Sequence, residues 1–141
     1  MANFQISGLE NVIKSFSDIS SIPDDVKKDI LKAMGNATSK AQAASAEAMG
    51  VKDTGAMIES LQVKSPKLTD DGGSVTITFK GTRTDENHKT PTRNAEIAFI
   101  NEFGKDGQQA RPFIKTANTK NEAKIAEAGQ TVFNRWIDDK T

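Results

Sequence analysis

The stretch PDDVKKDILKAMGNATSKAQAASAEAM, residues 23–49, sets the architecture of this chain. Ser21, Pro23 and Asp24 signal a helix start, and apolar residues then recur at steps of three and four as far as Met49. The spacing predicts a single helix with one buried face. That face comprises Val26, Ile30, Ala33, Ala37, Ala41, Ala44 and Ala48.

This helix is long for the chain that carries it. About 26 residues at 1.5 Å each give ~39 Å, whereas a compact globule of 141 residues has a diameter of ~37 Å. The helix must therefore span the domain or project from it. Its alanine-lined second half either allows another backbone to approach closely or reflects only the high helix propensity of alanine.

Composition narrows the class of protein. The length suits one domain, residues 1–141, and Leu, Ile, Val and Phe account for 29 of the 141 residues, so we expect a thin core. Lys plus Arg balances Asp plus Glu at 19 each, which disfavours nucleic-acid and membrane-surface binding. There is no cysteine, no apolar run long enough to span a membrane and no secretory signal pattern.

The segments on either side of the long helix predict short elements. Phe4 and Ile6 alternate as in a strand, and Ser7 with Glu10 forms a capping box ahead of a short helix. After the break at Thr54-Gly55, residues 56–61 form a helical turn or a strand entry. Apolar alternation on both sides of the TDDGG turn then predicts a hairpin over 61–79, with Pro66 at an edge or a bulge.

Residues 80–94 contain no Ala, Val, Ile, Leu, Met, Phe, Trp, Tyr or Cys, so we expect a loop that cannot pack on its own. It is either a mobile surface loop or a segment that orders against a partner. Residues 95–104 fit both helical and alternating templates, and we favour a short helix. Pro112 suits the first turn of a final helix to about Ile137, despite Gly129. The apolar face of that helix comprises Ile114, Ala117, Ile125, Ala128, Val132 and Trp136.

Motifs for catalysis are missing from this sequence. The single histidine, His88, lies in the polar loop without cysteine or a carboxylate at metal-site spacing, so we expect no metal site. No phosphate-binding glycine pattern and no local nucleophile arrangement occurs. We therefore expect a non-enzymatic protein without cofactor, for which an interaction or structural role is the natural alternative.

Several motifs occur in an order that is typical of a known family. Asp-Thr-Gly (53–55) follows the alanine-rich helix, a hairpin comes next, Ile-x-Phe-Ile-x-Glu-Phe-Gly occupies 97–104, and Ala-Arg-Pro-Phe-Ile-x-x-Ala (110–117) opens the last helix. In this arrangement, from about Gly8 to Ile137, the chain resembles the tail-completion or head–tail joining proteins of long-tailed double-stranded DNA bacteriophages, also called minor tail or neck proteins. Val51-Lys52-Asp53 departs from the proline common there, and Ile97 from the tyrosine.

The resemblance implies an α+β fold, with a small antiparallel sheet against two long helices, and a structural role in the virion after synthesis in the bacterial cytoplasm. It implies a six-fold ring at the head-proximal end of the tail, without catalytic activity. The partners would be the tail terminator, the connector or stopper, and further copies, with DNA only as passing cargo. The alternatives are a tail terminator or connector-type neck protein, or a small prophage-encoded DNA-binding protein.

Physical roles follow for the motif residues. Glu102 and Arg111 flank the loop 104–110, so we expect either a charge-assisted pair that closes its base or an exposed pair worth at most ~1 kcal/mol. Phe103 and Phe113 should clamp the loop ends onto the core, and Gly104 should adopt a positive φ or allow close approach.

Two further groups complete the candidate residues. Thr54 is expected to cap the turn that follows it, with Gly55 relieving strain. Within loop 80–94, we expect either ordering against a protein partner or contact with DNA through basic residues. The candidates in that loop are Arg83, His88, Lys89 and Arg93.

Overall fold

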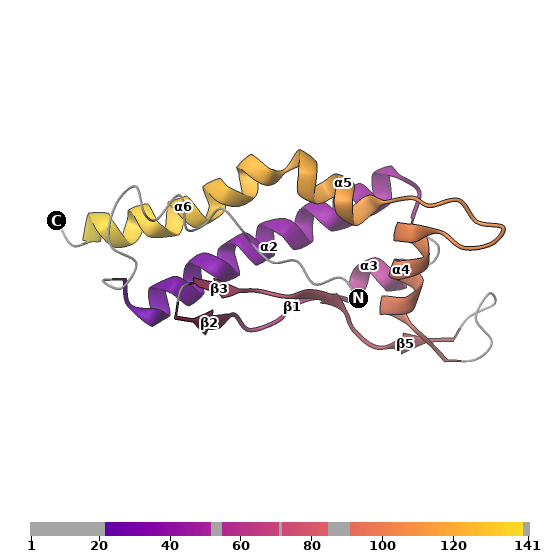
Figure 1. Ribbon diagram of the computed structural model, residues 1–141, viewed down its shortest axis with the longest axis horizontal. Helices are drawn as coiled ribbons and strands as arrows, with labels where there is room; N and C mark the ends of the chain where they lie inside the picture. Colours follow the sequence, from indigo (N-terminus) through magenta and orange to yellow (C-terminus); the bar gives the residue numbers. More distant parts are fainter. Residues whose placement is uncertain (1–21, 52–54, 71, 85–90, 140–141) are drawn as a thin grey trace.

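The protein has an α+β architecture in which α2 (Asp24–Ala48) lies between a β-ribbon and a second helical layer (Figure 1). The computed structural model describes residues 22–51, 55–70, 72–84 and 91–139. The strand expected at 4–6 and the helix expected after Ser7 lie outside these residues. The predicted fold class, a small antiparallel sheet against long helices in a single domain, is confirmed.

Helix α2 is 25 residues long and begins and ends where the sequence indicates. Asp24 and Asp25 occupy its first turn, where carboxylates are favourable to the helix dipole. At its other end Gly50 adopts a φ of 73°, and the amides of Gly50 and Val51 donate to Glu47 and Ala46, 3.2 and 2.8 Å away. This is a Schellman motif, which satisfies the last carbonyls of the helix.

The buried face of α2 differs from the predicted alanine stripe. Ala44 and Ala48 are exposed, whereas Thr38 and Gln42 are fully buried. The reason is that α2 is contacted from two sides, so its buried face is wider than one stripe and centred elsewhere. The buried residues are Ile30, Leu31, Met34, Gly35, Thr38, Gln42 and Ala46.

The predicted hairpin is confirmed and carries a bulge. The outer ladder pairs β2 (Lys67–Thr69) with β3 (Gly72–Ser74), and the inner ladder pairs β1 (Leu61–Val63) with β4 (Ile77–Phe79). Between the two ladders three residues, 64–66, face two, 75–76, on the opposite strand. Pro66 lies in this bulge, which avoids the loss of a ladder hydrogen bond.

Four shorter elements complete one end of the molecule. Residues 56–61 give α3 (Ala56–Glu59), so the helical alternative holds there. The ends of the polar loop pair as β5 (Thr82–Arg83) and β6 (Thr92–Arg93), so the expectation of fifteen unstructured residues is wrong at both ends. The ambiguous stretch forms α4 (Asn94–Phe103), as favoured, and Asn94 Nδ2 donates to Lys80 O at 3.1 Å.

The final helix is interrupted, contrary to the expectation of one continuous element. It consists of α5 (Phe113–Lys120) and α6 (Glu122–Asp139), separated at Asn121. The predicted apolar face also omitted Phe113 and Phe133, the two largest fully buried side chains. A continuous apolar period cannot reveal the break, because Ala117 and Ile125 remain buried on its two sides.

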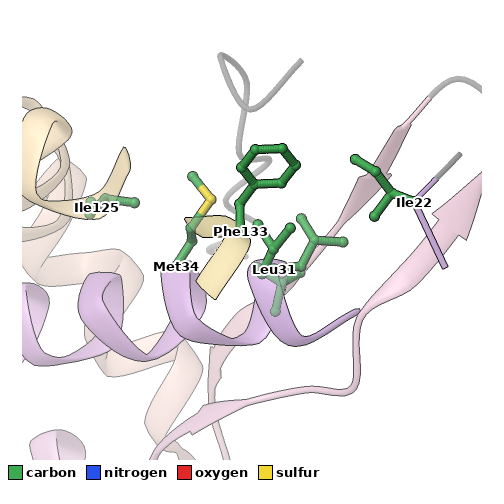
Figure 2. Close-up of a cluster of buried hydrophobic side chains, with 7 residues drawn as sticks. Ile22, Leu31, Met34, Ile125 and Phe133 are labelled. Atoms are coloured by element: carbon green, nitrogen blue, oxygen red, sulfur yellow. The ribbon is translucent and has the colours of Figure 1, made fainter. Parts of the chain in front are cut away.

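Two clusters of apolar side chains form the core. One joins the first half of α2 to α6, and Figure 2 draws its side chains and labels Ile22, Leu31, Met34, Ile125 and Phe133. The other lies at the opposite end of α2, beside α4 and α5. It contains Ala46, Val51, Met57, Phe79, Ile97, Ala98 and Phe113.

Two helical glycines permit the close approach of these layers. A Cβ at Gly35 would lie 2.9 Å from Val63 Cγ1 and 3.0 Å from Val75 Cγ2. A Cβ at Gly129 would lie 2.7 Å from Met34 Sδ. Gly129, which helix propensity alone disfavours, is therefore explained by the packing of α6 on α2.

We predict that Gly35→Ala lowers the free energy of unfolding by ~1–2 kcal/mol, because overpacking outweighs the gain in helix propensity. Gly129→Ala should cost less, since its neighbour Met34 is flexible whereas valine is stiff at χ1. Urea denaturation of both variants checks this order, with the exposed Asn36→Ala as control. A Gly35→Ala protein as stable as the control would contradict the packing argument.

Candidate functional site: a docking surface at the α4 end

The segment 102–113 is the site that the sequence singled out, and it joins α4 to α5 beyond the end of α2 (Figure 1). Gly104 has a φ of 78°, and a Cβ there would lie 2.9 Å from both Ala110 N and Gln108 O. Both expectations for Gly104, positive φ and close approach, are confirmed. The loop thus closes tightly as it leaves α4.

The loop 104–110 is held by backbone hydrogen bonds at its base and its tip. At the base, Gly104 N donates to Ile100 O at 2.7 Å and Arg111 N donates to Asn101 O at 2.6 Å. At the tip, Lys105 and Gln108 exchange two bonds of 3.0 and 2.9 Å around a turn whose third residue, Gly107, has a φ of 81°. A type II turn requires this positive φ. The loop is therefore a braced projection.

Glu102 has a different role from the one expected. Its carboxylate is buried, and it accepts hydrogen bonds from the amides of Ile114 at 2.7 Å and Lys115 at 3.1 Å. These amides belong to the first turn of α5, which has no side-chain cap of its own. A carboxylate at a helix N-terminus is stabilised by the free amides and by the helix dipole. Glu102 thus fastens α4 to α5.

Arg111 also finds a partner other than Glu102. Its Nη1 donates to Gly50 O at 2.8 Å, at the Schellman motif that ends α2. Among the described residues no ion pair joins Arg111 to Glu102, so the expected pair at the base of the loop is wrong. Nothing in the sequence marks Gly50 as the acceptor, because the two residues are brought together only by the tertiary fold.

Pro112 and Phe113 begin α5. Pro112 takes the N-cap position, just before the predicted first turn, with φ −76° and ψ 71°. Phe113 N donates to Arg111 O at 2.8 Å, which closes an inverse γ-turn at the proline. Phe113 is fully buried, with its ring edge-on to Phe79 at 6.1 Å between centroids. Its expected role as a clamp on the core is confirmed.

Phe103 does not clamp the core. It is 67% exposed, and its ring lies 4.8 Å from that of Phe99, which is 50% exposed. Among the described residues these are the two exposed large apolar side chains. The opposite face of α4 buries Ile97, Ala98 and Glu102. The i, i+4 spacing of Phe99 and Phe103 marks them as neighbours on one face of a helix. The tertiary structure decides that the opposite face, with Ile97 and Ala98, is the buried one.

Of the remaining candidate site residues, the structure describes some and not others. Gly55 has a φ of 85° directly before α3, as expected. Arg93 is exposed and directly precedes α4. In the β5–β6 ladder its backbone pairs with Thr82, and the backbone of Arg83 pairs with Thr92. Thr54, His88 and Lys89 lie outside the described residues. The β5–β6 pair and loop 104–110 project at the same end of the molecule (Figure 1).

Two other kinds of site are absent from the part of the chain that the structure describes. No group of histidine and carboxylate side chains there has the arrangement of a metal site. No helix in the same part of the chain is long and apolar enough to cross a bilayer. Comparison of the chain with protein-family models, with curated proteins and with solved structures finds no match.

We predict that Glu102→Ala lowers the free energy of unfolding by ~2 kcal/mol, because two amides in the first turn of α5 lose a charged acceptor. Arg111→Ala should cost less than ~1 kcal/mol, since its bond is exposed. In a double-mutant cycle by chemical denaturation the two effects should add. A coupling energy well above ~0.5 kcal/mol would instead support the ion pair between Glu102 and Arg111. Substitution of the exposed Glu96 by alanine serves as the control.

Proposed function

We propose that this protein is a structural virion protein that completes the head-proximal end of a phage tail and helps to join the tail to the DNA-filled head. The observation that carries the proposal is the exposed Phe99–Phe103 pair beside the braced loop 104–110. The order of the sequence motifs, which resembles that of tail-completion proteins, supplies the biological setting.

Most residues of the motif at 102–113 have a role in the fold itself. Glu102 caps α5, Gly104 permits the turn, Arg111 binds the end of α2 and Phe113 fills the core. Phe103, by contrast, contributes little to the fold, because its side chain is mostly exposed. An exposed aromatic pair on a rigid support is the usual form of an interface anchor, because little conformational entropy is lost when it is buried.

The size of the patch limits what it does by itself. A fully buried phenylalanine covers ~150–250 Å², whereas stable interfaces bury ~1,200–2,000 Å² in total. The pair is therefore the centre of a wider contact that takes in loop 104–110 and the β5–β6 pair. The proposed partners are a neck or tail protein, such as a tail terminator, connector or stopper, with further copies of this chain completing a ring. DNA would pass through without specific contact.

Deletion of the gene in frame from the parent phage tests the role. We expect electron micrographs of lysates to show DNA-filled heads beside separate tails, because the step that joins them is blocked. A complemented lysate is the control. Intact infectious particles without the protein would refute the proposal and favour the alternative of a DNA-binding accessory protein.

Substitution of the aromatic pair tests the surface. We expect Phe99→Ser with Phe103→Ser to leave the melting temperature within about 2 °C, since both side chains are exposed. Complementation of the deletion should fall at least tenfold in plaque titre, because the interface anchor is lost.

The matched variant for this test is Phe99→Leu with Phe103→Leu, which keeps the surface apolar. It should restore a substantial part of the titre. If the serine variant gave wild-type titres, docking would have to use another surface, and the proposed joining role would still stand.

A further inference from the structure

A layer of polar side chains divides the core at the middle of the helical pair. Thr38 and Gln42, one turn apart on α2, are both completely buried. Gln42 Nε2 donates to Asn118 Oδ1 of α5 at 3.2 Å, and Thr38 Oγ1 donates to Met34 O at 2.8 Å. Gln42 Oε1 is buried without a hydrogen-bonding partner among the described residues. We call Thr38, Gln42 and Asn118 the polar seam.

The seam coincides with the boundary between the two apolar clusters. Met34 belongs to the cluster shared with α6, and Ala46 belongs to the cluster shared with α4 and α5. Thr38 and Gln42 lie between these two positions on α2. On the helical side of the core, one side-chain hydrogen bond, from Gln42 to Asn118, joins α2 to α5 between the two clusters.

The break between α5 and α6 lies at the same level. Gln42 faces Asn118 and Met34 faces Gly129, so Asn121 falls opposite the segment of α2 that carries the seam. Asn121 has φ −113° and ψ 13°, far from the helical values near −63° and −42°. Its Nδ2 donates to Ala117 O at 2.8 Å, so its side chain competes with the regular backbone pattern.

α2 itself carries a feature that favours bending at this level. The Thr38 hydroxyl donates to the carbonyl four residues earlier, an arrangement that often bends helices. The β-ribbon also changes register next to Val63, which contacts Gly35 one turn away from Thr38. The ribbon and the α5–α6 layer therefore depart from regular geometry near the seam, and α2 carries a hydrogen bond that favours bending there.

We propose that the polar seam is a hinge about which the α4 end of the protein turns relative to the half built on α6. A change of angle there separates few apolar contacts and leaves Gln42 free to exchange one polar partner for another. Each apolar cluster stays intact during the motion. The hinge lets the docking surface adjust its angle while its own braces, at Glu102 and Arg111, stay fixed.

Spin labels measure this motion directly, because the chain contains no cysteine that would compete for the label. Lys28→Cys on α2 and Glu96→Cys on α4 are exposed and lie on opposite sides of the seam. Electron–electron double resonance between them reports the distribution of their separation. A second pair of labels within one half, at Lys28→Cys and Arg135→Cys, gives the width of the distance distribution that is expected without a hinge.

The decisive variant fills the seam with apolar side chains of similar size: Thr38→Val, Gln42→Leu and Asn118→Leu. We expect the distance distribution across the seam to narrow at least twofold, while the pair within one half is unchanged. If this triple variant fails to fold by circular dichroism, Gln42→Met alone is measured against the same expectation.

α6 offers a matched control with the same chemistry outside the seam. Thr131 Oγ1 donates to Glu127 O at 2.9 Å, and Gln130 Nε2 donates to Asn134 Oδ1 at 2.8 Å. Thr131→Val, Gln130→Leu and Asn134→Leu should leave the distribution across the seam as broad as in the wild type. The hinge proposal would be wrong if the distance distribution across the seam were equally wide in the wild type and the filled variant. It would also be wrong if the control variant narrowed that distribution as much as the filled variant does. Neither result depends on whether the protein joins heads to tails.

Discussion

The close approach of α2 to its two neighbouring layers is the constraint on which the rest of the structure depends. On one side, Gly35 leaves room for Val63 and Val75 of the ribbon to pack against α2. On the other side, Gly129 lets α6 pack closely against Met34. A chain with few large apolar residues has little area to bury, so short distances between layers are needed to keep its core dense. The two glycines provide these distances, and they sacrifice some helix propensity to do so.

The end of α2 organises the α4 end of the molecule. The Schellman motif leaves the Gly50 carbonyl available to Arg111, and Glu102 fastens the start of α5 to α4. The motif that carries the family resemblance is thus mostly a structural device, in which polar groups satisfy helix ends. These hydrogen bonds hold α4 and loop 104–110 in place next to the exposed aromatic pair, which suits the proposed assembly role better than a mobile loop does.

Stiffness and adjustability therefore occupy different places in this protein. The loop 104–110 and the termini of α4 and α5 are braced by hydrogen bonds, whereas the polar seam across α2 and α5 carries the proposed freedom of movement. Separating the two has a physical advantage. Binding to a rigid surface costs little ordering entropy, while a hinge remote from that surface still allows the contact to meet partners at different angles.

The sequence by itself determined the elements with strong local signals, namely the bounds of α2 and the hairpin, and it narrowed Pro66, α4 and Gly104 to two alternatives each. Each follows from periodicity or from backbone sterics within a few residues. Tertiary structure alone decided which face of α2 is buried and where the last helix breaks. It also decided that Glu102 caps α5, that Arg111 reaches Gly50 and that Phe103 faces solvent. These depend on which distant segments meet, and a charged or aromatic side chain has several suitable partners until the fold selects one.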